Sequence, residues 1–417
     1  MQTRIHLLGL SCLAWLMLVT TGLTRPACAS NSYYVDSNKG NDSNKGAISS
    51  PFRTIKKGVS ILKPGDKLLL RAGLYEESFS STTLPGGTSW NSAVTIASYP
   101  GEQVTIKPRR DPSVYRVFSF DYGSQRYIVL DGLILDGSNV IDQVIKIQYT
   151  GKDPENHAGY IRVINCEIRN APHSGIAVGT TNYGGHNEFI KLNVHHNGST
   201  GLDHGIYIFG SHNLVQNCDF HHNAGYGVHV YKETRELVDY NTIRNNRIHD
   251  NGTARGPMGG AGIILSSGKG NIAHYNVIWA NLGGIRVDYG ASDSQVYNNT
   301  IYGNDAFGIY LGEACTNTIV KNNIIYENRT TISDKAKDTI ASNNLTTDPR
   351  FVRADANDFR LQPGSPAIDA GTDVGLIQDC DDNPVPQRKT PDIGAYEYVD
   401  KTSSIHNVQI HLGSPSN

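Results

Sequence analysis

The sequence predicts an all-β solenoid, in which short strands stack in successive coils. Between residues 165 and 345 one phrase recurs: an apolar residue, then Asn two or three positions later, then Gly-Ile-x-Val or a close variant. The units are short, because the apolar position returns every 20 to 30 residues. Units of this size can bury their apolar residues only by stacking on each other. The recurring apolar positions are Ile168, Val194, Phe220, Ile248, Ile278, Ile301, Ile325 and Leu345.

The first 29 residues are expected to be a secretory signal peptide. Arg4 supplies the positive start, residues 7–23 are apolar, and Ala27 and Ala29 provide small residues for cleavage. A membrane anchor is the alternative, but a cleavage site follows directly, and no later stretch is long and apolar enough to span a bilayer. We therefore expect a protein secreted to the periplasm or the medium after cleavage near Ala29.

The remaining 388 residues suit one large solenoid, which we expect to be a monomer. They carry 35 basic and 39 acidic residues, a balance that excludes a generally basic nucleic-acid binder. The expected divisions are a signal peptide (1–29), an N-terminal cap with the first coils (30–110), the repeated coils (111–346), a C-terminal section (347–400) and a loose tail (401–417).

A short helix is expected to cover the open N-terminal end of the stack. Ser50-Pro51 is a good helix start, and an amphipathic helix there would cover core and unpaired backbone. Residues 67–78, 93–101 and 103–108 then read as strands and turns. The apolar face of the expected helix consists of Phe52, Ile55, Val59 and Leu62.

Alternation within the repeated phrase predicts which side chains form the core. In residues 205–209, Ile206 and Ile208 face one side, and Tyr207 and Phe209 face the other. The same choice recurs in every unit. The inward columns are Ile176, Ile206, Val228, Ile263, Ile285, Ile309 and Val178, Ile208, Val230, Leu265, Val287, Leu311.

Asparagines recur at two turns and are expected to form ladders, each amide donating to one neighbouring coil and accepting from the other. Sugar or metal binding is the functional alternative. The first column is Asn197, Asn223, Asn251, Asn281, Asn304 and Asn328, and the second is Asn246, Asn276, Asn299, Asn323 and Asn343.

The cysteines are expected to be mostly unpaired. Cys166 and Cys218 occupy the same slot two units apart, about 10 Å at the spacing of stacked strands, which is too far for a disulfide. They read as buried apolar residues. Whether Cys315 and Cys380 pair stays open.

Two segments carry a resemblance to known proteins. Residues 33–78, "YYVDSNKGNDSNKGAISSPFRTIKKGVSILKPGDKLLLRAGLYEES", resemble the opening of family 9 polysaccharide lyases and their relatives. "SPAIDAGT…DIGAYEY" resembles the C-terminal section of secreted bacterial β-helix proteins. The chain is thus similar to the pectin-lyase-like superfamily, which implies a right-handed parallel β-helix with a short N-terminal capping helix. That fold hosts lyases, hydrolases, epimerases and adhesins, so it does not decide the function.

Chemistry is expected on the outward face of the Gly-Ile-x-Val strands, flanked by insertions at 232–240 and 252–262. A lyase or C5-epimerase acting on an acidic, uronate-containing glycan needs a cation for the carboxylate, a base and an acid. His229 and Tyr207 are neighbours on adjacent coils, and either one is a candidate for the base with the other as the acid. The cation candidates are Arg286, Lys232 and Arg255. Substrate contacts are expected from His173, Phe209, Tyr226, Tyr231, Arg255, Asp288 and Tyr310.

Asp203-His204, directly before one of these strands, partly matches the Asp-x-His motif of the mannuronan C5-epimerases, where both residues are catalytic. The resemblance therefore adds both to the candidates, although His204 also reads as a turn residue. An inverting glycoside hydrolase would need two carboxylates, for which Asp203 and Asp288 are the evident pair. A non-catalytic glycan-binding or cell-surface protein is the third class.

Histidines form an expected outward column of their own, made of His195, His221 and His249 and continued by Trp279, Tyr302 and Tyr326. It reads either as a solvated aromatic stack or as a transition-metal site. The family 9 lyases use Ca2+ held by clustered aspartates, with a lysine base, so that resemblance implies calcium as a cofactor and Lys232 as a loose candidate for the base. The central coils carry no Asp-Asp pair, and Asp381-Asp382 lies in the C-terminal section.

Overall fold

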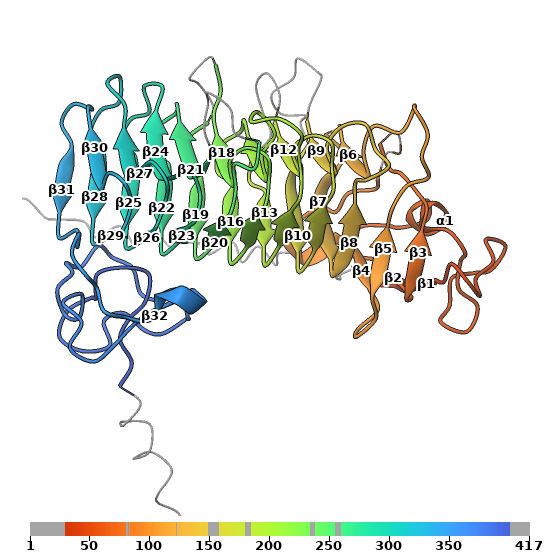
Figure 1. The fold of residues 1–417 in the computed structure, drawn as a ribbon. Helices are drawn as coiled ribbons and strands as arrows, with labels where there is room; N and C mark the ends of the chain where they lie inside the picture. The colour runs from red at the N-terminus through yellow and green to blue at the C-terminus, as the bar shows by residue number, and fades with distance from the viewer. Residues whose placement is uncertain are drawn as a thin grey trace, which may run out of the picture.

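The chain folds as a parallel β-helix, which confirms the predicted all-β solenoid. The computed structural model describes residues 30–80, 82, 84–121, 123–148, 158–179, 185–233, 238–254 and 260–400. Successive coils contribute strands to three long parallel sheets, which run side by side along the solenoid (Figure 1). The expected signal peptide and C-terminal tail lie outside the described residues.

Each sheet takes one strand from successive coils. The twelve-stranded sheet contains β1 (Ser32–Val35), β2 (Lys67–Leu70), β4 (Val94–Ser98), β7 (Arg126–Asp131), β10 (Gly159–Ile164), β13 (Glu188–Ile190), β16 (Leu214–Gln216), β19 (Thr242–Arg244), β22 (Ile272–His274), β25 (Gln295–Tyr297), β28 (Ile319–Lys321) and β31 (Ile340–Ser342). The ten-stranded sheet contains β3 (Gly73–Tyr75), β5 (Val104–Ile106), β8 (Leu133–Asp136), β11 (Glu167–Arg169), β14 (Asn193–His195), β17 (Asp219–His221), β20 (Arg247–His249), β23 (Val277–Trp279), β26 (Thr300–Tyr302) and β29 (Ile324–Tyr326). The nine-stranded sheet contains β6 (Phe118–Phe120), β9 (Ile145–Ile147), β12 (Ile176–Val178), β15 (Ile206–Ile208), β18 (Val228–Val230), β21 (Ala261–Ser266), β24 (Gly283–Asp288), β27 (Phe307–Leu311) and β30 (Ile332–Asp334).

The two predicted inward columns form the core of the coils. All twelve of their residues are fully buried and belong to one apolar cluster that runs through the stack. Of the recurring apolar positions, only Leu345 is partly exposed, because no further coil follows it. The alternation of the Gly-Ile-x-Val phrase therefore identifies the inner face of the nine-stranded sheet correctly.

The asparagine ladders are confirmed, with one correction and one addition. In the first column each side-chain amide donates to the carbonyl of the next, as from Asn223 to Asn251 at 2.9 Å. The second column ends on Asn344, which accepts from Asn323 at 2.9 Å. The prediction of Asn343 at that place is wrong, because Asn343 takes a left-handed turn and donates to the Ala370 carbonyl. A third ladder, which the sequence analysis missed, joins Asn187, Asn213, Asn241 and Asn271.

The capping helix exists, but it begins later than expected. Helix α1 spans Ile55–Val59, and the Thr54 hydroxyl caps it by accepting from the Lys57 amide. The predicted start at Ser50-Pro51 is wrong, because Asp42 accepts from the Arg53 and Thr54 amides and holds that segment outside the helix. All four residues of the predicted apolar face are nevertheless buried. One short 3-10 helix, η1 (Trp90–Ser92), follows among the first coils.

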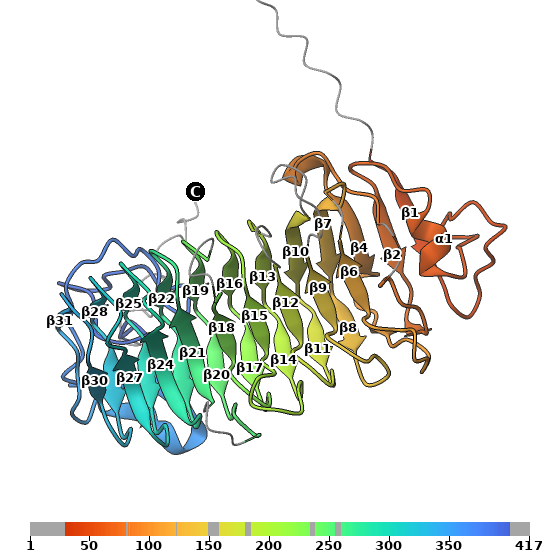
Figure 2. The same cartoon turned by 90° about the horizontal axis from the view of Figure 1, so that it is seen from above.

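The C-terminal section turns back along the solenoid. Its antiparallel hairpin, β32 (Phe351–Arg353) and β33 (Asp358–Leu361), is joined through the 3-10 helix η2 (Ala354–Ala356). The hairpin packs on the outer face of the ten-stranded sheet, where Phe359 lies 5.4 Å from the Trp279 ring. Helix α1 sits at the N-terminal end of the stack, whereas β30 and β31 remain at the other end (Figure 2).

The four cysteines of the described residues, Cys166, Cys218, Cys315 and Cys380, are all free. Cys166 and Cys218 are buried, as predicted. None of the helices in the described part of the chain is long and apolar enough to cross a membrane.

Candidate functional site

The outward column of the nine-stranded sheet is formed as predicted. Tyr207 on β15 pairs with His229 on β18, which pairs with Ile264 on β21 and then with Arg286 on β24. Neighbouring strands lie about 4.8 Å apart, so side chains two coils apart can meet over the intervening one. The complete column reads Ser119, Lys146, Ala177, Tyr207, His229, Ile264, Arg286, Tyr310 and Ser333.

A pocket of about 210 Å³ opens over four of these coils. Tyr207, His229 and Arg286 all line it, so the three principal candidates converge on one concave site and do not merely share a flat face. Aromatic rings form most of the wall, and Arg286 is its one charged lining residue in the described part of the chain. The lining residues are Leu202, His204, Tyr207, Tyr226, His229, Tyr231, Ile264, Ser266, Arg286 and Tyr289.

Two histidines at the base of the pocket are hydrogen-bonded in series. The Tyr226 backbone amide donates to His204 Nδ1 at 3.1 Å, and His204 Nε2 lies 2.9 Å from His229 Nδ1. Burial lowers the pKa of His204 to about 3. Burial also lowers the pKa of His229 well below its usual range, and the nearby His204 and Arg286 act in the same direction. Both rings are therefore neutral near pH 7.

Parallel aromatic rings hold His229 in place. The Tyr207 ring stacks on it at 4.5 Å with 1° between the planes, and Tyr231 lies parallel at 5.5 Å. Burial raises the pKa of the Tyr207 hydroxyl above its usual value, and the neighbouring Tyr231 and Tyr226 act in the same direction. The Tyr207 hydroxyl consequently stays protonated near neutral pH and is available as a proton donor.

Arg286 enters the pocket with its charge already partly paired. Its Nε donates to Asp288 Oδ2 at 2.9 Å, and its guanidinium lies 5.3 Å from the Tyr310 ring. Asp288 also accepts from the Tyr289 amide at 2.8 Å. Asp288 and Tyr310 thus orient the arginine from outside the pocket, and neither lines it.

Asp203 lies beside the pocket but does not line it. Its carboxylate accepts from the Ser199 and Thr200 amides and the Thr200 hydroxyl, and His173 Nδ1 lies 2.9 Å from Oδ1. Although burial opposes ionisation, these hydrogen bonds lower the pKa of Asp203. Asp203 and His173 therefore shape the turn before β15, and of the predicted Asp203-His204 pair only His204 reaches the pocket.

Two other candidates also stand apart from the pocket. Lys232 is buried and does not line it. Phe209, which directly follows β15, does not line it either, and its ring lies 3.9 Å from the Tyr207 ring with 36° between the planes. Arg255 lies outside the described residues, within the second of the two insertions. The predicted patch is therefore narrower than expected, and it centres on His204, Tyr207, His229 and Arg286.

Sequence reasoning missed Lys146, Leu202 and Tyr289. Lys146 occupies the same outward column two coils before Tyr207, and its Nζ lies 5.4 Å from the centre of the Phe209 ring. Burial lowers its pKa to about 8, and Arg116 adds to this effect. The alternation in Ile145-Lys146-Ile147 was the available signal, because it continues the pattern of the later coils. Leu202 and Tyr289 lie just outside strands, where alternation gives no direction.

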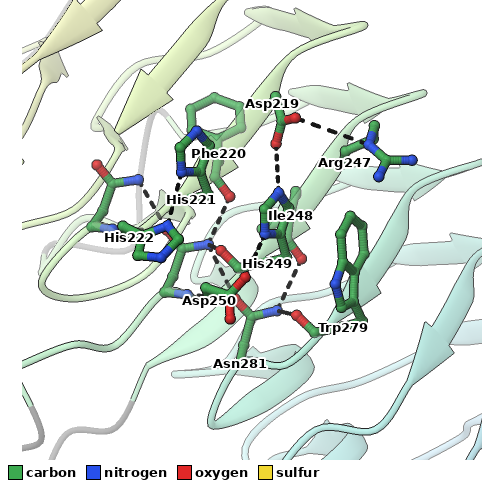
Figure 3. A network of polar contacts seen from close by, with 12 residues as sticks. Asp219, Phe220, His221, His222, Arg247, Ile248, His249, Asp250, Trp279 and Asn281 are labelled. Atoms are coloured by element: carbon green, nitrogen blue, oxygen red, sulfur yellow. Dashed lines mark hydrogen bonds and ion pairs between the residues drawn. The ribbon is translucent and has the colours of Figure 1, made fainter. Parts of the chain in front are cut away.

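The predicted histidine column is present on a different sheet. The His195 and His221 rings stack at 4.9 Å. The His249 ring stacks on His221 at 5.2 Å, and the Trp279 ring continues the stack (Figure 3). His249 lies between two carboxylates, with Nε2 3.0 Å from Asp219 and Nδ1 2.6 Å from Asp250. The column belongs to the outer face of the ten-stranded sheet, so it is not part of the pocket.

The residues that the structure describes do not fit a calcium or transition-metal centre. Among the described residues, no group of three or more His, Cys, Asp and Glu side chains is arranged to hold a metal ion. The nitrogens of the stacked imidazoles are hydrogen-bonded to neighbouring side chains. In His221, Nε2 lies 3.1 Å from Asn193 Oδ1, and Nδ1 lies 2.9 Å from His222 Nδ1. No carboxylate lines the described wall of the pocket, and carboxylates are the ligands that calcium prefers.

Comparisons with known proteins support the fold. Residues 180–346 match the family described as right handed beta helix region, and residues 38–85 match a protein of unknown function, DUF1565. A search of curated protein sequences found no match.

Solved structures agree with this architecture. A pectate lyase, Pel9A, superposes with a TM-score of 0.66 at 18% identity, over 88% of this chain and 96% of its own. A glycoside hydrolase superposes with a TM-score of 0.53 at 12% identity, over 76% of this chain and 96% of its own. At these identities the likeness shows the fold alone, and the chain is a right-handed parallel β-helix.

Proposed function

We propose that this protein is a polysaccharide lyase that cleaves an acidic, uronate-containing glycan by β-elimination. The supporting observation is the convergence of Tyr207, His229 and Arg286, from three different coils, on one pocket of about 210 Å³. The Arg286 guanidinium and the tyrosine and serine hydroxyls of the lining can all donate hydrogen bonds, which suits an anionic sugar. The likeness to a pectate lyase and a glycoside hydrolase agrees with a polysaccharide-active protein.

The proposed reaction needs a cation, an acid and a base. Arg286 pairs with the uronate carboxylate and stabilises the negative charge that develops when the C5 proton leaves. The C4–O bond then breaks as the C4–C5 double bond forms, and the departing oxygen takes the proton of the Tyr207 hydroxyl. The C5 proton goes to a neutral amine, for which we propose Lys146. It lies outside the pocket lining, two coils before Tyr207 in the same column, and its pKa of about 8 leaves a lone pair available in mildly alkaline solution.

An inverting glycoside hydrolase is less well supported. Such an enzyme needs a carboxylic acid and a carboxylate on either side of the scissile bond. Asp203 is saturated by its own turn, Asp288 is held by Arg286, and neither lines the pocket. A C5-epimerase remains the second candidate, because it removes the same proton and differs only in returning one to the opposite face.

The cellular location is part of the proposal. The charged start, apolar run and Ala27/Ala29 site of the first 29 residues support secretion followed by cleavage near Ala29. Amino-terminal sequencing of the protein recovered from the medium or periplasm of an expressing cell should begin at Ser30. A protein that retains its first residues and sediments with membranes would contradict the proposal.

The direct test is absorbance in the unsaturated-uronate band while the protein is incubated with alginate, pectate, heparinoid and chondroitin, each with and without Ca2+. One of these polymers should give a rise. Tyr207→Phe should slow it by at least about 100-fold, the usual contribution of a general acid. Tyr310→Phe is the matched control, because it belongs to the same column and lies outside the pocket.

The other outcomes separate the remaining classes. No rise on any polymer, together with inversion at C5 seen by NMR, would identify an epimerase. Retention on a polymer without any chemical change would identify a binding protein. Equal losses of rate in Tyr207→Phe and Tyr310→Phe would show that the pocket does not take part in the reaction.

A further inference from the structure

The hydrogen bonds at the base of the pocket fix where each imidazole proton lies. A neutral imidazole has one N–H donor and one acceptor nitrogen, and the partners of the ring decide which is which. The Tyr226 backbone amide can only donate, so His204 Nδ1 must carry the lone pair in their 3.1 Å contact. The His204 proton therefore lies on Nε2, and the burial of His204 (1% exposed) keeps the ring neutral.

The same logic extends one residue further. His204 Nε2–H points at His229 Nδ1 at a distance of 2.9 Å, so His229 Nδ1 must accept. The His229 proton is thereby confined to Nε2, which has no hydrogen-bond partner among the described residues. The ring cannot readily turn away, because Tyr207 and Tyr231 lie parallel to it and the His204 ring meets it at 84°.

We propose that His204 is a positioning residue that fixes His229 as its Nε2–H tautomer, so that the pocket presents an N–H donor to the carboxylate of an acidic sugar. The identity of the ligand rests on the proposed function, whereas the tautomer rests on the geometry alone. His229 then acts beside Arg286 in holding the anion. It does not remove the C5 proton, because its accessible nitrogen carries no lone pair.

This arrangement explains why a backbone amide stands at the start of the chain of hydrogen bonds. A side-chain partner at that position could itself rotate or titrate. Either change would allow His204, and through it His229, to adopt the other tautomer. An amide N–H does neither near neutral pH, and it is held by the coil that also carries His229. The repeat that forms the pocket therefore also fixes the direction of the Tyr226 N–H.

The tautomer is tested on the free protein by long-range proton–nitrogen correlation NMR of the imidazole rings. His204 and His229 are assigned by comparison with His204→Gln and His229→Gln. Both rings should show a protonated Nε2 and an unprotonated Nδ1, and neither should titrate over the range of an ordinary histidine, about pH 5 to 8. A protonated Nδ1 on His229, or a titration of His229 near pH 6.5, would overturn the proposal.

Two variants of His204 separate positioning from simple structure. His204→Phe keeps a ring of similar shape but offers neither acceptor nor donor, so His229 should populate both tautomers and become titratable. His204→Gln keeps an amide acceptor for Tyr226 and an amide donor for His229, so it should retain the Nε2–H tautomer. If His204→Phe folds with the His229 signals unchanged, His204 has no positioning role. Loss of the tautomer in the glutamine variant also counts against it.

The ligand is tested separately with oligogalacturonate, oligomannuronate and the neutral methyl ester of each. An acid oligosaccharide should shift the His229 Nε2–H signal, and its methyl ester should not. In His204→Phe the KM for the acid should rise at least tenfold. The kcat should change less, which would show that the variant affects binding more than the chemical step. If the tautomer is present but no acid oligosaccharide shifts the signal, the carboxylate assignment fails although the positioning role stands.

Discussion

The asparagine ladder makes the stability of the coils sensitive to one amide. Asn223 is fully buried in the middle of the first ladder, in the coil that carries Tyr226 and His229 to the pocket. Its side chain donates to the Val194 carbonyl at 3.0 Å and to Asn251 at 2.9 Å, and it accepts from the Asn197 backbone and side-chain amides at 3.3 and 3.0 Å.

Replacing Asn223 with Ala removes all four hydrogen bonds where water cannot take their place. At about 1 kcal/mol for each bond, the free energy of unfolding should fall by about 4 kcal/mol. The Asn223 backbone is not left-handed, so Ala introduces no strain of its own. The measurement is urea unfolding followed by circular dichroism, with the midpoint compared at an unchanged m-value.

Asn328→Ala is the matched control. Asn328 ends the same ladder and also makes four side-chain hydrogen bonds. It donates to the Ile301 and Tyr326 carbonyls and accepts from the two Asn304 amides. It is only partly buried, so water should replace most of these bonds and the loss should stay near 1 kcal/mol. Equal losses in the two variants would refute the reasoning, because burial would then not decide the cost. A loss below about 1 kcal/mol for Asn223→Ala would do the same.

Three further predictions follow from the site and the C-terminal section. Although burial opposes its charge, the hydrogen bonds to Asp219 and Asp250 raise the pKa of His249, so its contribution to stability is present below pH 6.5 and is lost as pH rises through the folded pKa. The difference in unfolding free energy between wild type and His249→Gln should therefore shrink from pH 5.5 to pH 9, and a constant difference would contradict this. If Lys146 is the base, the lyase rate should climb as pH rises through about 8, whereas a flat profile from pH 7 to 9 would exclude that role. Phe359→Ala should cost about 3–5 kcal/mol in urea unfolding, since Phe359 is 1% exposed and packs against Trp279, but should leave the rate unchanged because the pocket is on another sheet.

The sequence was sufficient for the core of the fold because strand alternation has a fixed period. Ile206 and Ile208 could be placed inside, and Tyr207 outside, without knowing where the neighbouring coils lie. The exact end of a ladder could not be placed in the same way. Asn343 and Asn344 are adjacent and chemically identical, and only the left-handed backbone of Asn343 decides that Asn344 takes the rung.

The sequence predicted which residues of the candidate site share an outward column, but not which of them line the pocket. Tyr207, His229 and Arg286 were found because they face outward from strands whose register follows from the repeat. Asp203 looked equally suitable, yet its carboxylate is occupied by the Ser199 and Thr200 amides of a turn. Hydrogen bonding within an irregular turn leaves no periodic trace in the sequence. The likeness to lyases could not settle it either, since that fold carries many chemistries.

The two ends of the stack differ in a way that matters for association between molecules. Helix α1 closes the N-terminal end, whereas β30 and β31 leave strand edges at the other end, with Ile340 54% exposed. Such edges invite pairing with a strand of another chain, and charged side chains are a common protection. Here four charges interrupt the last coil, at Asp334, Lys335, Lys337 and Asp338. Neutralising them would expose a ready template for fibre growth, and the same edge is where an engineer would graft additional coils.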